Sequence, residues 1–184
     1  MEFEQMEIAG AWKARSKHHI DQRGSFSEWF KGDEIQATLG REFRVEQANF
    51  SVSHKNVIRG IHFSKAIAGQ GKWITCVSGS LWDVIVDIRQ DSPTFKKWIG
   101  IELSSTCGES IFISEGLGHG FMALEDQTVA AYLLTSGFMP DLEFGINPFD
   151  PDLKINWPNR DFVLSEKDRL APSLQQQLDS GKLK

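Results

Sequence analysis

The segment 81–89 has an apolar side chain at every even position, while its odd positions carry two aspartates and an arginine. The even positions are Trp82, Val84, Val86 and Ile88. A period of two is that of a β-strand with one face against a core. We therefore predict a half-buried strand here, which must pair with other strands of the chain in a sheet.

Five further short segments are also rich in apolar residues. Turn-forming residues, mostly glycines, separate them. These predicted strands are 56–63, 72–77, 98–103, 110–114 and 128–135. Short strands at regular spacing, without helical patterns between them, are typical of antiparallel sandwiches and barrels. Two short helices are predicted, at 33–39 before Gly40 and at 172–178, and 138–160 is predicted as an ordered loop. We predict an all-β jelly roll with peripheral helices.

The composition is that of an ordinary globular protein. The chain has 184 residues, 40% of them hydrophobic, which suits one domain spanning 1–184. A net charge of −5 argues against a long polyanion as partner, because such binding needs a basic face. Two cysteines, no secretory signal and no apolar run of about 20 residues indicate a cytoplasmic protein that does not cross membranes.

The first candidate for chemistry is His62, in the tetrapeptide Arg59-Gly60-Ile61-His62. A cation and a titratable imidazole bracket a glycine that permits close approach to the backbone. The alternative is a histidine that is simply satisfied on a strand face. Because Arg59 and His62 would point to opposite faces of a regular strand, a shared ligand requires a bend near Gly60.

A second histidine, His119, lies in a segment with glycines at 116, 118 and 120. Such a segment buries little side chain, so a functional role or a tight turn is favoured over packing. Metal-binding β-barrels commonly offer two histidines one residue apart with a nearby carboxylate, and no His-x-His occurs here. A metal-dependent enzyme therefore stays a weaker alternative, and we predict no metal.

Tyr132 is the only tyrosine in a chain with thirteen phenylalanines. It sits in an apolar predicted strand, where it either packs as a phenylalanine would or supplies a phenol as a general acid. Lys72 begins another predicted strand and, taken alone, would be a solvated charge. Arg23, Phe26 and Glu28 combine charge, a flat ring and an acceptor, and Gln47 and Asn49 offer amides suited to a base or sugar.

Taken in order, these pieces resemble one known family. The matching blocks include Asp21-x-Arg23-Gly24-x-Phe26-x-Glu28, Gln47-x-Asn49-x-Ser51, Arg59-Gly60-x-His62, Lys72, Asp83-Val84-x-Val86-Asp87, Gly116-x-Gly118-His119-Gly120-Phe121, Tyr132 and Ser165-x-Lys167-Asp168. Eight blocks in order, from about residue 8 to 174, resemble the dTDP-4-dehydrorhamnose 3,5-epimerase family. The resemblance implies a cupin-type jelly roll, a homodimer, and a dTDP-4-keto-6-deoxyhexose as substrate, with neither metal nor nicotinamide.

The resemblance also implies roles for single residues. His62 would be the base that removes a proton beside the ketone, Asp168 would orient its imidazole, and Tyr132 would be the acid on the opposite face. Lys72 would stabilise charge on the carbon-4 oxygen. The implied substrate-binding residues are Arg23, Arg59 and Lys167 at the diphosphate or nucleotide, Phe26, Glu28, Gln47 and Asn49 around the nucleotide, some from a partner subunit, and His119 and Glu143 at the sugar.

The sequence departs from the family pattern at Phe138, where the family commonly has a tyrosine that stacks on thymine. Stacking is retained, but a hydroxyl contact is lost. Relatives that act only at carbon 3 or carbon 5 share nearly all these motifs. A monoepimerase and a non-catalytic nucleotide-sugar-binding jelly roll therefore remain as alternatives to a 3,5-epimerase.

Overall fold

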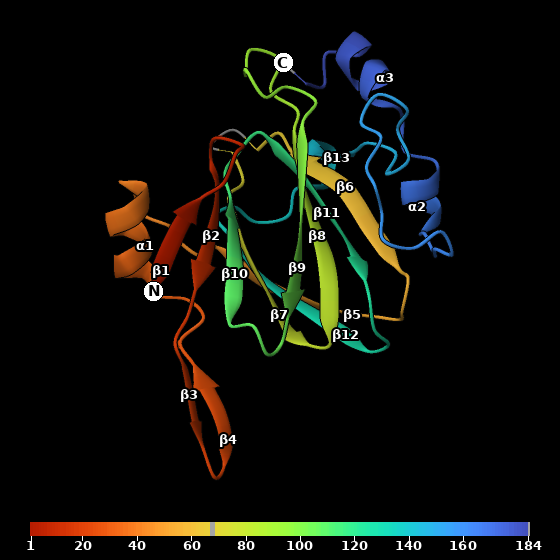
Figure 1. Cartoon of the computed structure of the whole chain (residues 1–184). Coiled ribbons are helices and arrows are strands. Elements are labelled where there is room, and N and C mark those ends of the chain that lie inside the picture. Colours follow the sequence, from red (N-terminus) through yellow and green to blue (C-terminus); the bar gives the residue numbers. More distant parts are fainter. Residues whose placement is uncertain (67–68, 184) are drawn as a thin grey trace.

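The computed structural model describes residues 1–66 and 69–183, and its architecture is two stacked antiparallel sheets (Figure 1). The larger sheet has the order β1 (Glu2–Gln5), β2 (Ala11–Arg15), β10 (Glu109–Ile113), β7 (Lys72–Ser78), β12 (Thr128–Leu134) and β5 (Gln47–Ser53). The smaller sheet has the order β13 (Glu143–Gly145), β6 (Ile58–Ser64), β11 (Leu117–Ala123), β8 (Ser80–Asp87) and β9 (Trp98–Ser104). These sheets confirm the predicted all-β class.

Three apolar clusters account for the packing of both sheets. One fills the space between the sheets and includes Ile74, Leu81, Ile85 and Ile111. A second lies on the outer face of the smaller sheet, under the C-terminal segment 146–183. The third lies on the outer face of the larger sheet, under helix α1. Because each fully buried Ile or Leu side chain contributes roughly 1.5–3 kcal/mol, these layers hold the strands that frame the interior.

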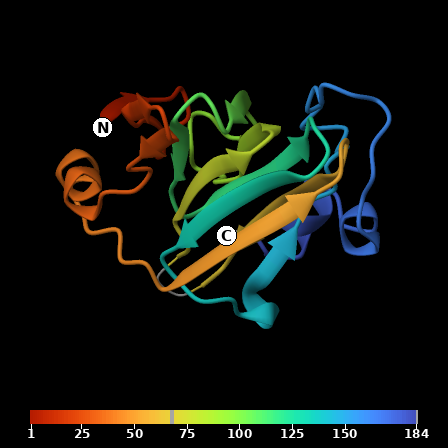
Figure 2. The same cartoon turned by 90° about the horizontal axis from the view of Figure 1, so that it is seen from below.

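The helices are few and peripheral, and they lie on opposite sides of the sandwich (Figure 2). Helix α1 (Gly32–Leu39) ends at Gly40 with φ +70°, which confirms the predicted stop. Helix α3 (Leu174–Asp179) begins with a capping box at Ser173, close to the predicted position. Helix α2 (Glu166–Arg169) was not predicted, because four residues are too few to show a helical period.

The prediction of a loop over 138–160 is wrong in part. This segment contains the 3-10 helix η1 (Pro140–Leu142) and strand β13, which pairs with β6. A three-residue edge strand has no hydrophobic alternation to read, since its pairing alone defines it. A further hairpin, β3 (His18–Asp21) with β4 (Gly24–Ser27), projects from the body of the molecule (Figure 1).

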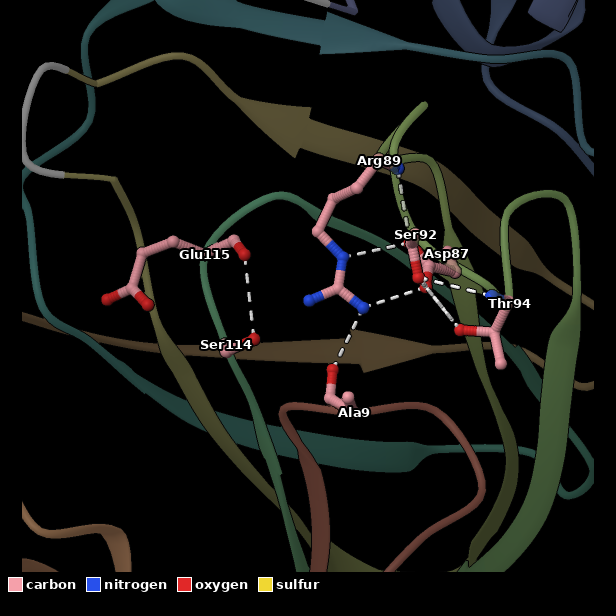
Figure 3. A network of polar contacts seen from close by, with 7 residues as sticks. All are labelled: Ala9, Asp87, Arg89, Ser92, Thr94, Ser114 and Glu115. Carbon is pink, nitrogen blue, oxygen red and sulfur yellow. Dashed lines mark hydrogen bonds and ion pairs between the residues drawn. The ribbon is translucent and has the colours of Figure 1, made fainter.

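The prediction that segment 81–89 is buried on one face only is also wrong. In strand β8 the carboxylates of Asp83 and Asp87 are both fully buried. Asp87 accepts hydrogen bonds from the Arg89 guanidinium at 2.9 and 2.7 Å and from Ser92 Oγ at 2.6 Å (Figure 3). Buried charge is tolerated where it is paired and hydrogen-bonded, which is why polar residues occupy an interior face here.

The network around Asp87 also ties distant segments together. Thr94 Oγ1 donates to the same carboxylate at 2.5 Å, and Arg89 Nη2 donates to the Ala9 carbonyl at 2.9 Å (Figure 3). Burial raises the pKa of Asp87, but the hydrogen bonds from Arg89, Ser92 and Thr94 outweigh it and lower the pKa to about 2. The carboxylate is therefore charged and fixes the loop after β8.

Both cysteines are free, and Cys76 is buried. Burial raises the pKa of the Cys76 thiol to about 11. Over residues 1–66 and 69–183, the helices are too short or too polar to span a lipid bilayer.

Candidate active site

A cavity of about 550 Å³ opens between the two sheets. Eleven of the fourteen predicted site residues line it, and they come from both sheets, from α2 and from the loop between β12 and the 3-10 helix η1. They are Gln47, Asn49, Arg59, His62, Lys72, His119, Tyr132, Phe138, Glu143, Lys167 and Asp168. The fold thus brings together residues that lie more than one hundred positions apart in the chain.

His62 contacts a carboxylate at one wall of this cavity. Its Nε2 lies 2.6 Å from Oδ1 of Asp168, a buried carboxylate on α2. Ser165 caps that helix by accepting from the Asp168 backbone N–H at 3.1 Å, which fixes the carboxylate. Burial raises the pKa of Asp168, but the hydrogen bond and charge of His62 outweigh it and lower the pKa.

The exposure of this pair separates it from a histidine that merely fills a strand face. The His62 side chain is 41% exposed and lines the cavity, whereas the Asp168 side chain is 7% exposed. With Nε2 directed at the carboxylate, Nδ1 is the nitrogen left to accept a proton. The pair therefore has the arrangement of a general base with an orienting carboxylate.

Strand β6 bends where the sequence required it. Gly60 has φ +119°, and the register between β6 and β11 shifts between His119 and Phe121. A Cβ on Gly60 would lie 2.5 Å from the Gly120 Cα, so the close approach depends on glycine. As a result Arg59 and His62 both line the cavity.

Gly118 and Gly120, which flank His119, do not form a tight turn. They lie in strand β11, where a Cβ at either position would come within 2.8 Å of the Ile61 side chain. The expectation that packing does not explain them is therefore wrong, because small residues are needed for β6 to pack closely against β11. Gly116, with φ +80°, does lie in a turn before the strand.

His119 forms a second pair with a carboxylate that sequence reasoning did not assign to the site. Its Nε2 lies 2.8 Å from Oδ2 of Asp83, and His119 is the cross-strand register partner of His62. Among the described residues, no group of three or more His, Cys, Asp or Glu side chains is placed to hold a metal ion. Each of these two histidines instead engages an aspartate.

The facing sheet supplies Tyr132 from β12 and Lys72 from β7. The interpretation of Lys72 as a solvated charge is wrong, because its side chain is buried. Burial lowers the pKa of Lys72 to about 8, although the Glu143 carboxylate opposes the shift. Tyr132 lies beside Asn49 in the ladder and directs its ring into the space between the sheets.

The polar end of the cavity is held by amides and an arginine. Gln47 Nε2 donates to Asn49 Oδ1 at 2.9 Å, and Gln47 Oε1 accepts from the Phe138 backbone N–H at 2.7 Å. Arg59 Nε donates to Ser53 Oγ at 3.1 Å. The Phe138 ring is 59% exposed at the cavity, so a flat ligand has a free aromatic surface to stack on.

Three predicted site residues do not line this cavity. Arg23, Phe26 and Glu28 belong to or follow the projecting β3–β4 hairpin (Figure 1). Arg23 is paired with Asp21 of its own turn, and the Phe26 side chain is 65% exposed. Within one chain, the structure does not bring them together with the other eleven.

Several cavity residues were missed by sequence reasoning. Gln70, Ser51 and Ser165 contribute polar groups, and Phe121, Phe144 and Leu164 contribute apolar surface. For Gln70 a signal existed, because it lies two residues before Lys72 and so shares its side of an extended chain. Ser51, Phe121 and Ser165 carried the same signal, because each lies two residues from a predicted site residue. For Phe144 and Leu164, position in the sequence alone gives no comparable signal.

Comparisons with known proteins agree with this geometry. The family model described as dTDP-4-dehydrorhamnose 3,5-epimerase matches residues 5–176. A dTDP-4-dehydrorhamnose 3,5-epimerase of Mycobacterium tuberculosis is 40% identical over all of this chain and 92% of its own length.

Two solved structures are similar over nearly the whole chain. A 4-keto-6-deoxy sugar epimerase from the novobiocin biosynthetic gene cluster of Streptomyces spheroides has a TM-score of 0.97 at 39% identity, covering 100% of this chain and 92% of that one. A 3'-monoepimerase from Streptomyces bikiniensis, in complex with dTDP-quinovose, has a TM-score of 0.93 at 38% identity, covering 97% and 90%.

Proposed function

This chain belongs to the dTDP-4-dehydrorhamnose 3,5-epimerase family, and we propose that it epimerises a dTDP-4-keto-6-deoxyhexose at carbons 3 and 5. One observation carries the proposal. His62, paired with Asp168 of α2, and the Tyr132 phenol lie on opposite sheets across one cavity. Inversion of a carbon needs a base on one face and an acid on the other, and this arrangement supplies both.

In the proposed reaction, His62 is the general base. The ketone at carbon 4 acidifies the hydrogens on carbons 3 and 5, and Nδ1 of His62 takes one of them. Asp168 then stabilises the imidazolium through the 2.6 Å contact to Nε2. The lowered pKa of Asp168 keeps that carboxylate charged and able to do so.

The other wall completes the reaction. Removal of the proton leaves an enolate whose charge lies on the carbon-4 oxygen, and the buried Lys72 ammonium stabilises that charge. Tyr132 then delivers a proton to the face opposite His62. Each epimerisation consumes no cofactor, because the proton removed is replaced and the carbon skeleton keeps its oxidation state.

The remaining cavity residues are proposed to bind the nucleotide and the sugar. Arg59 and Lys167 supply cations for the diphosphate, and Gln47 and Asn49 supply amides. Phe138 stacks on the base. The sugar end is completed by His119 and Glu143.

A monoepimerase acting at one carbon is the second candidate, and the 38% identity to the monoepimerase of Streptomyces bikiniensis supports it. The test is NMR of dTDP-4-keto-6-deoxyglucose incubated with the protein in deuterated water. Deuterium at carbons 3 and 5 is expected for the 3,5-epimerase, and deuterium at one carbon would identify a monoepimerase. Binding without any exchange would overturn the enzymatic proposal in favour of a nucleotide-sugar-binding protein.

We further propose that the enzyme is a homodimer and that the β3–β4 hairpin of one subunit completes the cavity of the other. The support is the position of Arg23, Phe26 and Glu28 away from the cavity of their own chain. The projecting hairpin exposes two large apolar side chains, Ile20 at 79% and Phe26 at 65%, which a partner subunit would bury.

Mixed dimers test this directly. Phe26→Ala combined with Arg23→Ala should give one weakly active homodimer, and His62→Asn should give another. Mixing and reassembling the two should restore activity, because one cavity then receives an intact hairpin and an intact base. The control mixes His62→Asn with Tyr132→Phe, where both changes lie in the cavity and no intact site can form. Failure of the first mixture, or a fully active monomer, would contradict the proposal.

The single domain spanning 1–184 and the cytoplasmic location are also proposals. The stacked sheets share one interior cluster, which supports one folding unit. The two free thiols suit a reducing compartment. Limited proteolysis followed by mass spectrometry should yield no stable fragment of half size.

A further inference from the structure

The side chain of Gln70 lies between two charged side chains of the cavity, Lys72 and Glu143. We propose that Gln70 is a positioning residue that directs the Lys72 ammonium into the cavity and keeps it apart from the Glu143 carboxylate. The inference rests on the function proposed above, in which Lys72 stabilises the enolate.

The orientation of the Gln70 amide is determined by its neighbours. Gln70 Oε1 accepts a hydrogen bond from Lys72 Nζ, and Gln70 Nε2 donates to Glu143 Oε1 at 3.3 Å. An ammonium can only donate and a carboxylate can only accept, so a flipped amide would lose both contacts. The Nε2 group also donates to Ser136 Oγ at 3.3 Å.

The backbone on both sides of Gln70 is held in place. Gly71 N donates to Thr135 Oγ1 at 2.7 Å, and Thr135 N donates to the Gly71 carbonyl at 3.0 Å. Gly69 has φ +74°, and a Cβ there would lie 2.2 Å from the Glu115 side chain. Gln70 itself is 6% exposed. A buried side chain on an anchored turn can hold a neighbouring group in one place.

The amide between the two charges has a chemical consequence. A direct ion pair with Glu143 would occupy the Lys72 ammonium and neutralise much of its field. Instead one hydrogen of Nζ goes to Gln70, and two remain for a substrate oxygen. In the part of the chain that the structure describes, Nζ of Lys72 makes no other hydrogen bond and no ion pair.

Several charged or titratable groups surround Lys72, and each can influence its titration in a pH experiment. Glu143 is the carboxylate that raises the pKa of Lys72 against the effect of burial. The other charged or titratable side chains of the cavity are Arg59, His62, His119, Tyr132, Lys167 and Asp168. Outside the cavity, Glu115 packs on the same turn and is paired with Arg41. Substitutions at Gln70 leave all of these groups in place.

Two variants of Gln70 separate positioning from packing. Gln70→Met keeps the length of the side chain and removes its polar atoms, so kcat should fall about 10- to 100-fold while KM changes less than about threefold. Because the Lys72 ammonium loses a hydrogen-bond acceptor, its pKa should fall. The decrease in activity at alkaline pH should therefore begin at a lower pH than in the wild type. Gln70→Glu restores an acceptor for Lys72, so the decrease in activity at alkaline pH should begin at a higher pH than in Gln70→Met.

A second measurement needs no substrate. Labelling with an amine-specific acylating reagent, mapped to Lys72 by mass spectrometry over a pH series, follows the free amine of this one lysine. Its half-maximal pH should fall in Gln70→Met and rise in Gln70→Glu. The control is Gln177→Met, since Gln177 is similarly buried at 5% and donates to the Gly145 carbonyl at 2.6 Å instead of contacting Lys72.

The outcomes are distinct. An unchanged labelling profile in a folded Gln70→Met protein, or an equal shift in Gln177→Met, would overturn the proposal. If Gln70→Met does not fold, the comparison of Gln70→Glu with the wild type decides in the same way. A labelling shift in a protein that shows no deuterium exchange would contradict the proposed function and leave the positioning of Lys72 supported.

Discussion

His62 and His119 lie side by side on neighbouring strands of the smaller sheet, and each is paired with an aspartate. His62 pairs with Asp168 at 2.6 Å, and His119 pairs with Asp83 at 2.8 Å. Their exposure differs, because the His62 side chain is 41% exposed and the His119 side chain is 13% exposed. A histidine–carboxylate contact therefore does not by itself identify a base. Both histidines line the cavity, and the greater exposure of His62 favours its pair as the proposed site of proton transfer.

The carboxylates of the two pairs also differ in their surroundings. Asp168 is supplied by α2, and a Ser165 cap and the His62 ring hold its charge. Asp83 is fully buried inside the sheet, and its Oδ1 has no hydrogen-bond partner among the described residues. A carboxylate buried in this way can orient the His119 ring, but it cannot move together with a substrate. We therefore assign proton transfer to the first pair and orientation of His119 to the second.

The largest effect is expected when His62 is replaced by asparagine, and the same replacement of His119 provides the comparison. His62→Asn should lower the rate of deuterium incorporation about 10³-fold or more, because the general base is lost. His119→Asn should act mainly on KM. NMR in deuterated water measures both variants under the same conditions. Comparable losses of kcat in the two variants would contradict the assignment of a single base.

Tyr132→Phe separates the two walls of the cavity. Without the phenol, the proton removed by His62 is not replaced from the opposite face, so inversion should fall about 10²-fold or more. Exchange of solvent deuterium into unreacted substrate, which needs only the His62 wall, should be affected less. NMR distinguishes exchanged substrate from inverted product. Equal losses of exchange and inversion would argue that Tyr132 does not act as the acid.

The aspartates provide the next comparison. Asp168→Asn should lower kcat about 10²-fold, since the imidazolium loses its stabilising charge. Asp83→Asn should act mainly on KM and lower kcat by about tenfold or less, because it acts only through the orientation of His119. Steady-state kinetics on both variants, with circular dichroism to confirm folding, make the measurement. A reversed order would indicate that the buried pair transfers the proton.

Most of the site could be predicted from the sequence because its motifs, taken in order, resemble those of one family, whereas strand alternation and local motifs alone left structural roles open for the same residues. His62, Lys72 and Tyr132 each lie on a predicted strand, and the glycine beside Arg59 indicated the bend. The burial of Lys72 was not predictable, since it depends on Gln70 and on Glu143 from the distant β13. Such contacts arise from tertiary packing, which no local period encodes.

The errors have a common cause. A strand with aspartates at alternate positions indicates a solvated face, yet in β8 those positions are interior. The partners that make this possible are His119 and Arg89, and the sheet order alone brings His119 to β8. In the same way, the place of the β3–β4 hairpin is not decided within one chain. In the proposed homodimer, a partner subunit receives it.

The smallest effect on chemistry, and a clear one on stability, is expected at Asp87 on the same strand as Asp83. Its folded pKa of about 2 lies below the value of 3.8 for a free side chain. The carboxylate therefore stabilises the fold by about 2 kcal/mol above pH 4, and this contribution is lost as the pH falls towards 2. Asp87→Asn should remove it while leaving kcat within about threefold at low temperature.

Urea unfolding of the wild type and Asp87→Asn at pH 7 and pH 3 tests this sign. The difference in the free energy of unfolding should be larger at pH 7 and should narrow at pH 3. Asp91→Asn is the matched control, because Asp91 is exposed on the loop that follows. A constant difference at both pH values would show that Asp87 acts through its shape and neutral hydrogen bonds. In that case β8 would hold one functional carboxylate, Asp83, and one whose charge is incidental.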